Sequence, residues 1–430
     1  MIKEKIAFYL LATAIVLTIH SCKNNSIANT KFVTVENGRL MRNGKPYRYI
    51  GTNLWYAPIL ASEGTGGDRQ RLSKELDALK SMGCLNVRVL AGADGKHGVK
   101  WKMEPTLQPQ AGVYNDTLLT GLDWMLKELS ERDMTAVIYL NNSWDWSGGY
   151  GFYLQEAGHG KTEPMNQIGY PAYTERMTYF CKDTLAQRLF ANHVKKIVGR
   201  TNSYTLQPYT EDPTIMAWQI GNEPRAFSHK MKQPFAKWLR ETSTLIKSID
   251  SNHLVSIGSE GTWGCENDPE LCEQISSDPN IDYLTVHVWP YVWGWTTKGT
   301  LKEDLQSVKQ NTFNYIQENI SIANKLNKPV VIEEFGFPRD HGEFSRESST
   351  QTRDEYYSYI FSLMDTIPTI NAVNFWGWGG NAKPRHLWWQ SGDPYVSDPP
   401  QEEQGLFCVF DTDSTTINLI KKYNFIYQEK

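Results

Sequence analysis

The sequence is poor in cysteine, in histidine and in net charge. Its 430 residues include 6 Cys and 9 His, and the formal net charge is −4. A chain so close to neutral lacks the basic excess of nucleic-acid-binding proteins, so we expect no nucleic-acid partner. No pair of Cys or His has the spacing of metal ligands, and we expect neither a metal ion nor an organic cofactor. Any chemistry must therefore come from ordinary side chains.

Long hydrophobic runs are also missing, except near the N-terminus. The apolar run Ile6–Ile19 follows Lys3 and Lys5 and is too short to cross a membrane, which predicts a signal peptide over residues 1–21. Because Cys22 comes directly after it, this start resembles a bacterial lipoprotein signal. The resemblance implies a lipid-modified Cys22, a tether over residues 22–31, and an exported protein anchored to a membrane in the periplasm or at the cell surface. Ordinary cleavage and secretion remain the alternative.

The rest of the chain has no short-period repeat and no low-complexity linker, which favours a single domain over residues 32–430. Short apolar runs alternate there with segments of helical periodicity. We predict strands at residues 47–52, 85–90, 135–140, 215–220, 254–258, 283–287, 329–332 and 372–375. The main helices are predicted at residues 68–82, 118–129, 186–198, 235–249, 305–326 and 353–364. Eight such alternations predict the α/β class and a (β/α)8 TIM barrel with one catalytic domain.

Polar and aromatic residues follow the predicted strands. They are Trp55, Arg88, Asn142, Trp144, Asn222, Glu223, Glu260, His287, Trp289, Glu334 and Trp376. Each alone has an ordinary structural explanation; a Trp is usually core, and Glu223 could pair with Arg225 on a surface. In a barrel of parallel strands, however, all of them would meet at the carboxyl-terminal face, where the chemistry of such barrels takes place. Together they predict an active site.

Two carboxylates on different strands suit glycoside hydrolysis, with one as a neutral acid and the other as an anionic nucleophile. We select Glu223 and Glu334 for this pair. Arg88 would keep the nucleophile ionised, and the negative nucleophile would raise the pKa of the acid. Asn222 could donate a hydrogen bond to the sugar 2-OH, and Trp rings would support the apolar faces of sugars. The high aromatic content, with 15 Trp and 22 Tyr, agrees with a sugar-binding cleft.

At these residues the sequence resembles glycoside hydrolase family 5, and within it the endo-β-1,4-mannanases. Residues 218–225, Trp-Gln-Ile-Gly-Asn-Glu-Pro-Arg, look like the acid/base motif of the family, and residues 330–336, Val-Val-Ile-Glu-Glu-Phe-Gly, look like its nucleophile motif. The resemblance implies that Glu223 is the acid/base and Glu334 the nucleophile, with Glu333 as second choice. It also assigns Arg88 and the other strand-end residues to substrate binding. The family commonly has Tyr where this chain has Trp289, and an indole N–H can only donate.

The resemblance implies a retaining endo-β-1,4-mannanase without cofactor that acts on mannan, glucomannan or galactomannan. We expect a monomer, although the sequence itself does not give the oligomeric state. Another β-1,4-glycanase of the family, such as a glucanase, is an alternative. An exo-acting β-mannosidase is a further one, if the long loop at residues 381–404 blocks one end of the cleft. From a different class, a non-catalytic, surface glycan-binding lipoprotein would be expected to lack one of the two Glu residues.

The remaining cysteines fall into two groups. Cys265 and Cys272 lie close together in Gly-Cys-Glu-Asn-Asp-Pro-Glu-Leu-Cys, which in an exported protein predicts a loop disulfide. Cys84, Cys181 and Cys408 are isolated, and we expect them to be buried thiols.

Overall fold

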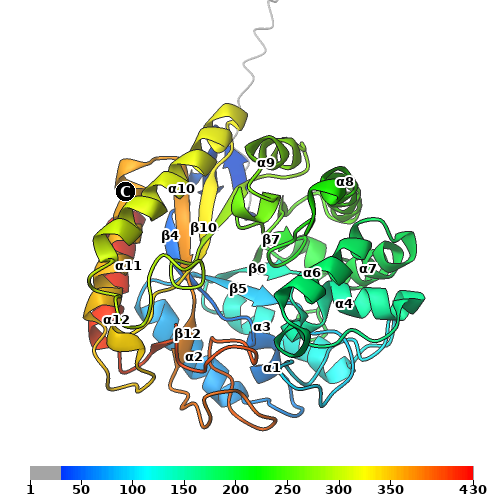
Figure 1. Cartoon of the computed structure of the whole chain (residues 1–430), viewed down its shortest axis with the longest axis horizontal. Coiled ribbons are helices and arrows are strands. Elements are labelled where there is room, and N and C mark those ends of the chain that lie inside the picture. Colours follow the sequence, from blue (N-terminus) through cyan, green and yellow to red (C-terminus); the bar gives the residue numbers. More distant parts are fainter. Residues whose placement is uncertain (1–30, 430) are drawn as a thin grey trace, which may run out of the picture.

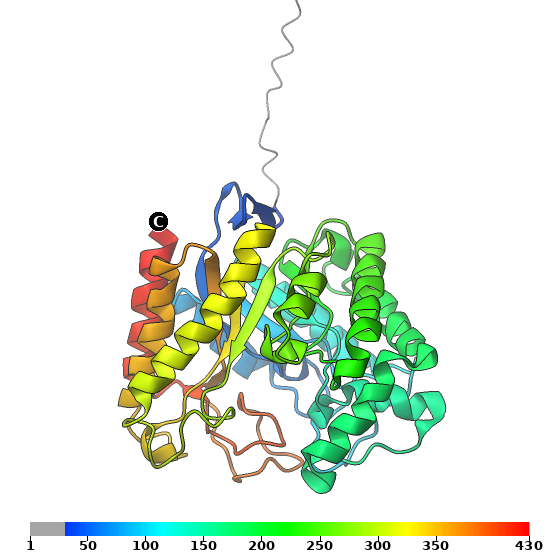
Figure 2. The same ribbon diagram turned by 45° about the horizontal axis from the view of Figure 1, so that its top comes forward.

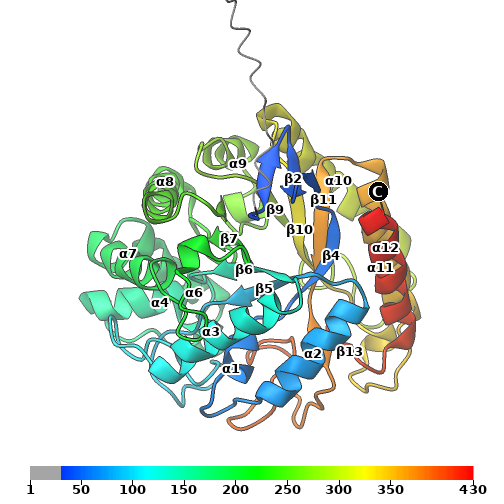
Figure 3. The same cartoon turned by 180° about the vertical axis from the view of Figure 1, so that it is seen from behind.

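A computed structural model describes residues 31–429 as a barrel of eight parallel strands surrounded by helices (Figures 1 and 3). The sheet runs in the order β8-β7-β6-β5-β4-β11-β10-β9. Backbone hydrogen bonds from Asp282 N to Val255 O (2.8 Å) and from His287 N to Glu260 O (3.1 Å) join its two ends. The predicted (β/α)8 barrel is confirmed.

The eight barrel strands are short and completely buried, as parallel strands covered on both faces must be. They are β4 (Tyr49–Asn53), β5 (Asn86–Leu90), β6 (Thr135–Tyr139), β7 (Ile215–Gln219), β8 (Leu254–Ser256), β9 (Leu284–Val288), β10 (Val330–Phe335) and β11 (Ile370–Phe375). Each overlaps one of the predicted strands, because a short apolar run between polar turns has few other ways to bury its side chains.

Long amphipathic helices form the outer ring. They are α2 (Arg69–Ser81), α3 (Asp116–Ser130), α7 (Thr184–Val198), α8 (Lys232–Ile249), α10 (Leu305–Leu326), α11 (Gln351–Thr366) and α12 (Ser414–Glu429). The Asp68 carboxylate accepts a hydrogen bond from Arg71 N (2.9 Å) and caps α2 as predicted. The sequence analysis missed α12, and it also missed the short helices α4 (Gly149–Leu154), α5 (Met165–Ile168) and α6 (Tyr170–Met177) that are inserted after β6.

An antiparallel ribbon closes the amino-terminal end of the barrel. It consists of β1 (Thr34–Glu36), β2 (Arg39–Arg42) and β3 (Lys45–Pro46). Its turns use Asn37-Gly38 and Asn43-Gly44, all four with positive φ, as predicted for Asn-Gly hairpins. Leu40 N donates to Asn371 Oδ1 (2.8 Å), which ties the ribbon to β11. In Figure 2 the ribbon lies at one end of the barrel, and the orange loop after β11 lies at the other.

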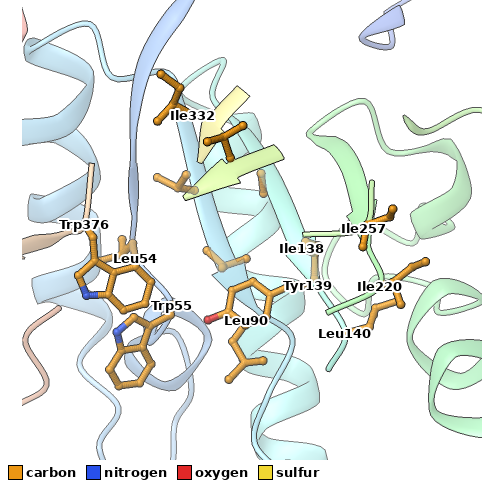
Figure 4. Close-up of a cluster of buried hydrophobic side chains, with 14 of the residues drawn as sticks. Leu54, Trp55, Leu90, Ile138, Tyr139, Leu140, Ile220, Ile257, Ile332 and Trp376 are labelled. Carbon is orange, nitrogen blue, oxygen red and sulfur yellow. The ribbon is translucent and has the colours of Figure 1, made fainter. Parts of the chain in front are cut away.

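Large side chains fill the barrel near its carboxyl-terminal end. Figure 4 shows Trp55 and Trp376 near each other, with Tyr139 and Leu90 beside them. All four are almost completely buried. This layer supports the side chains that follow the strands.

The predicted signal peptide, the lipidated Cys22 and nearly all of the tether lie outside the described residues, and they stay predictions. Within residues 31–429, none of the helices combines the length and the apolar character needed to span a membrane.

The predicted disulfide between Cys265 and Cys272 is wrong: both are free, buried thiols. The sequence between them does not form an open loop. Residues Pro269–Ser276 form α9, capped by Asp268, and Cys272 lies on the buried side of this helix. A hydrogen bond with the Cys272 thiol, together with burial, raises the pKa of Cys265. The three isolated cysteines are buried thiols, as expected.

We predict that Asn424 on α12 is a main determinant of stability. Its Oδ1 accepts from Ile50 N (2.8 Å), and its Nδ2 donates to Ile50 O (3.0 Å) and Met82 O (3.2 Å). The Asn424→Ala variant should lose about 2–4 kcal/mol of unfolding free energy, because buried groups of β4 are left without partners. Urea denaturation measures this. The matched variant Asn314→Ala, at an exposed position of α10, should change stability by less than about 0.5 kcal/mol. Equal losses in both would contradict the role of Asn424.

Candidate active site

Glu223 follows β7 in a sharply turned backbone. Its φ is +49°, a left-handed conformation that is uncommon and costly for a non-glycine residue. Residues that follow the neighbouring strands β8 and β6 hold this turn. Glu223 N donates to Gly258 O (2.9 Å), and the Ser143 hydroxyl donates to Glu223 O. Glu223 is 8% exposed, and it lines a cavity over the strand ends. Strain of this kind, fixed by its surroundings, is common at active sites.

Glu333 and Glu334 both lie in the barrel interior although they are adjacent on β10. Successive side chains of a regular strand point to opposite faces, but the register of β10 against β9 shifts between Ile332 and Glu334. Glu333 accepts two hydrogen bonds from Gln219 Nε2 (2.8 and 2.7 Å) and does not line the cavity. Glu334 lines the cavity. The geometry therefore favours Glu334 over Glu333 as the reactive carboxylate.

Arg88, at the centre of β5, is completely buried and organises the floor of the site. Its Nη1 donates to Glu334 Oε1 (2.5 Å), and its Nη2 donates to Asn222 Oδ1 (2.8 Å). Its Nε donates to Gln219 Oε1 (2.8 Å), and its guanidinium lies over the Tyr139 ring at 4.5 Å. Since Asn222 Oδ1 is occupied, its amide NH₂ group is the part available to a ligand. This orientation fits the predicted donor to a sugar hydroxyl.

Glu223 and Glu334 lie close together around His287. One oxygen of each carboxylate and one ring nitrogen of His287 lie within 4.8 Å of one another. His287 Nδ1 is 2.9 Å from Glu223 Oε1 and 3.4 Å from Glu334 Oε2. On the opposite side, Trp144 Nε1 donates to Glu223 Oε2 (2.5 Å). A carboxyl separation of about 5 Å is typical of glycoside hydrolases that retain configuration.

The charges of this group are tightly linked. Burial opposes a charge on His287, but the charge of Glu334 and hydrogen bonds to Glu223 and Glu333 prevail and raise its pKa to about 10. Burial also raises the pKa of Glu334 to about 7, against the attraction of His287 and Arg88. Burial alone would raise the pKa of Glu223, yet His287, Arg225 and Trp144 lower it. The expected raised pKa of Glu223 is therefore wrong, because the imidazolium favours its charged form.

The cavity above the carboxylates has a volume of about 480 Å³. Of the predicted substrate-binding residues, it is lined by Trp144, Asn222, Glu260, Trp289 and Trp376. Arg225, which the sequence analysis considered only as a surface partner of Glu223, instead binds Glu260 through two hydrogen bonds of 2.5 and 2.6 Å. Arg225 also lines the cavity. The pairing of Glu223 with Arg225 on a surface is thus excluded.

Four predicted substrate-binding residues do not line the cavity. Trp55 is completely buried, because the loop after β11 covers it and Ser397 O accepts a hydrogen bond from its indole (2.6 Å). Asn142 lies behind Asn222, and its Oδ1 accepts from Asn222 Nδ2 at 3.3 Å. Arg88 and His287 lie beneath the carboxylates that they hold. These residues position other groups.

Trp289, the departure from the usual Tyr, packs edge-on against Trp376 with ring centroids 5.9 Å apart, and against Phe407 at 5.1 Å. Within residues 31–429, its indole makes no hydrogen bond to Glu334; Arg88 Nη1 makes that bond. The substitution therefore adds an apolar wall without depriving the carboxylate of a partner.

The sequence analysis missed a large part of the cavity wall. The missed residues are Trp146, Met165, Tyr170, Arg225, Trp263, Val292, Trp293, Pro399, Gln401 and Glu402. Trp263 and Trp293 stack on each other with centroids 4.7 Å apart. Most of these residues lie in loops several positions beyond a strand, where periodicity carries no information. Only the high Trp content of residues 289–295 could have indicated that this segment forms part of the cavity wall.

A second hollow, of about 970 Å³, lies on the other side of Met165. It is lined by residues 98–101, Glu104, Asn166, Gly169 and residues 388–391, and Met165 belongs to the walls of both spaces. It contains neither member of the carboxylate pair, so the chemistry belongs to the smaller cavity.

Comparisons with known proteins agree with this geometry. The sequence model of a family described as GH family 5 beta-mannosidase-like matches residues 30–429. A curated relative, putative mannan endo-1,4-beta-mannosidase 9 of Oryza sativa subsp. japonica, is 26% identical over 82% of this chain and 82% of its own length.

Solved structures give a similar result. A glycoside hydrolase family 5 mannosidase from Rhizomucor miehei, in complex with mannosyl-fructose, is 31% identical and has a TM-score of 0.86 over 94% of this chain and 98% of its own. An endo-1,4-beta-mannanase from the same organism is 22% identical, with a TM-score of 0.65 over 93% of this chain and 100% of its own. The latter likeness concerns the fold alone.

We predict that the His287 ring is charged at pH 7, whereas the buried His193 is neutral because burial lowers its pKa to about 4. Nitrogen NMR of histidine-labelled protein distinguishes the two states, and the His287→Asn variant assigns the signal. In Glu223→Gln the pKa of His287 should fall, since one of the carboxylates that favour its charge is removed. A neutral His287 at pH 7 in the wild type would contradict the described network.

Proposed function

This chain belongs to the beta-mannosidase-like group of glycoside hydrolase family 5, and we propose that it is a retaining β-mannosidase that removes mannose from the non-reducing end of β-1,4-mannosides. The observation that carries this proposal is that the loop at residues 381–404 contributes Pro399, Gln401 and Glu402 to the wall of the cavity around Glu223 and Glu334. We infer that the loop closes one end of this cavity. The sequence analysis favoured endo action and made exo action conditional on such a closure.

The loop packs on residues that follow strands β4 and β5: Ser397 O accepts from the Trp55 indole (2.6 Å), and the Tyr395 hydroxyl donates to Glu104 O (2.8 Å). Its residues Pro399, Gln401 and Glu402 form part of the cavity wall. Asn166 Nδ2, on α5, donates to Gln401 O (3.0 Å), so the loop after β11 is joined to the insertion after β6. Together with Met165, this bridge separates the cavity from the larger hollow beyond it. A polysaccharide chain that runs through the site would have to cross this bridge.

The open side of the cavity suits the leaving group. The acid protonates the leaving oxygen, so the departing sugar lies next to Glu223, while the sugar that is attacked lies next to Glu334. Arg225, Glu260, Trp263 and Trp293, from the loops after β7, β8 and β9, form another part of the wall. Of these, Arg225 is close enough to lower the pKa of Glu223. The closed end lies toward Trp376 and residues 399–402 and would hold the terminal sugar. This arrangement predicts release of single mannose units.

In the first step Glu334 attacks the anomeric carbon, and the glycosidic bond breaks as its oxygen takes a proton from Glu223. In the second step water gives its proton to Glu223 and its oxygen to the anomeric carbon, and the ester bond to Glu334 breaks. Two displacements retain the configuration. His287 Nδ1, near both carboxylates, can pass a proton from Glu334 to Glu223 before the first step. This relay supplies the acid even though His287 favours an anionic Glu223.

Two alternatives remain as outcomes of experiments. Endo action has support from the name of the curated relative, a putative mannan endo-1,4-beta-mannosidase. A glucan substrate would differ from a mannan in the orientation of the 2-OH group, the group assigned here to the amide of Asn222. A non-catalytic glycan-binding protein has no support, because both carboxylates of the pair are present with Arg88 and His287 around them.

The Glu223→Gln variant should lower kcat/KM about 10²- to 10⁴-fold, since general acid catalysis is lost, and Glu334→Gln should lower it at least as much. Steady-state hydrolysis of 4-nitrophenyl β-mannoside measures both. Azide should restore activity to Glu334→Gly and give a mannosyl azide of inverted configuration. The exposed Glu303→Gln serves as control and should keep wild-type rates. Wild-type activity in either catalytic variant would contradict the assigned roles.

Product analysis separates exo from endo action. With mannohexaose, mannan and cellohexaose as substrates, we expect mannose as the first product from the mannosides and little hydrolysis of the glucan. Chromatography at early times, with substrates labelled at the reducing end, identifies which bond is cut. Short manno-oligosaccharides of mixed length as first products would refute exo action and restore the endo interpretation; release of cello-oligosaccharides would refute the substrate class.

A further inference from the structure

Glu333 is a third buried carboxylate at the strand ends, and the proposed chemistry does not use it. It is 1% exposed and, unlike Glu223 and Glu334, does not line the cavity. The shifted register of β10 leaves its side chain in the barrel interior, where a charged residue is rare unless it is paired. Burial of a carboxylate is costly unless partners compensate for the lost water, so its presence indicates a role in the electrostatics of the site.

Polar groups from three other strands surround Glu333. Both of its oxygens accept from Gln219 Nε2 (2.8 and 2.7 Å), which suits an ionised carboxylate because such a group only accepts. Its Oε2 lies 3.5 Å from Arg88 Nε and 3.8 Å from His287 Nε2. Arg88 and His287 are the cations that also hold the two reactive carboxylates. Glu333 is therefore part of the same charge network, on the side away from the cavity.

The two cations face three carboxyl groups. Arg88 Nη1 donates to Glu334 Oε1 (2.5 Å). His287 Nδ1 is 2.9 Å from Glu223 Oε1 and 3.4 Å from Glu334 Oε2. With all three carboxyl groups ionised, the cluster would carry one negative charge more than its cations balance, and a single bound proton removes that excess. Burial raises the pKa of Glu334, against the attraction of His287 and Arg88. The charges of Glu223 and Glu333 add to this rise.

The other titratable side chains that interact with Glu333 are tyrosines. Burial raises the pKa of each of them: Tyr49, Tyr139 and Tyr283. They are therefore neutral at the pH values at which the carboxyl groups titrate. Among residues 31–429, the charge of Glu333 is thus balanced by Arg88 and His287.

We propose that Glu333 is a positioning residue for the acid: its negative charge makes Glu223 and Glu334 keep one proton between them, which the acid then delivers to the leaving oxygen. This inference rests on the roles proposed above for that pair. Without Glu333, two cations would face two carboxylates, and both carboxylates would be ionised at neutral pH. The site would then contain a nucleophile but no acid. Glu333 acts through the other charges and does not touch the substrate.

The pH dependence of kcat/KM tests this role, because its bell shape reports the ionised nucleophile and the protonated acid of the free enzyme. In Glu333→Gln the alkaline limb should move about 1–2 pH units toward acid, since removal of an anion favours loss of the proton. For the same reason, nitrogen NMR should show a lower pKa of His287. Glu333→Asp keeps the charge and should keep the wild-type limb. Measurements with both 4-nitrophenyl β-mannoside and mannohexaose make the result independent of exo action.

Ser256→Ala is the matched uncharged control, because Ser256 Oγ accepts from the same Gln219 amide (2.9 Å). Its alkaline limb should stay in place, whatever happens to the rate. Thermal unfolding verifies that each variant is folded. Carbon NMR of glutamate-labelled wild type needs no variant: near pH 6 it should show an ionised Glu333, and a protonated Glu333 would overturn the role.

Two further outcomes separate this inference from the proposed function. If Glu223→Gln and Glu334→Gln are inactive but the alkaline limb of folded Glu333→Gln does not move, only the role of Glu333 fails. If Glu334→Gln keeps wild-type activity and azide rescues Glu333→Gly, Glu333 is itself the nucleophile, and the proposed roles and this inference fail together.

Discussion

The ion pair between Arg88 and Glu334 is the interaction on which the active end of this barrel depends. Both side chains are buried, and a buried carboxylate is tolerated only when cationic and hydrogen-bonding partners compensate for the loss of water. Arg88 also orients Asn222 and Gln219, and Gln219 in turn holds Glu333. One cation at the centre of β5 thus fixes polar groups that lie on, or directly after, two other strands, β7 and β10.

His287 extends this network to the second carboxylate. His287 lies between Glu223 and Glu334, and a positive charge on its ring would offset the repulsion between the two buried acids. The short distance between the two carboxyl groups and the electrostatic stability of the site therefore both depend on Arg88 and His287. The strained backbone at Glu223 and the shifted register of β10 bring the carboxylates to the positions where those cations hold them.

The loop after β11 determines how such a site is approached. The barrel alone would present its carboxylates in a groove, since the strand ends are arranged around an open face. Residues 381–404 cover Trp55, bridge to α5 and bring Glu402 into the cavity wall. Glu223 and Glu334 thereby share one cavity with residues of this loop. In the proposed function, the specificity of this glycoside hydrolase is set by this loop, which lies outside the eight barrel strands.

The amino-acid sequence by itself determined the barrel. Apolar runs of strand length, separated by amphipathic helices, allow few architectures, and for that reason the eight strands were predicted to within a few residues. The carboxylate pair, Arg88 and Asn222 were also predictable, because each directly follows or lies in a strand whose direction sets where its side chain is found. The Asn-Gly turns of the N-terminal ribbon could be predicted from the local sequence, because both residues of such a turn need a positive φ.

Contacts between distant segments were decided only by the tertiary structure. Trp55 was expected in the cleft, but a loop more than three hundred residues further along the chain covers it. The cysteine pair was expected to be bonded, but both thiols are free, and Cys272 lies on the buried side of α9. The pKa of Glu223 is lowered because His287, on another strand, hydrogen-bonds to its carboxylate and favours the charged form. Local periodicity records which face of an element is buried, whereas the shape of the cavity and the charge of its acids depend on which loops meet above the barrel.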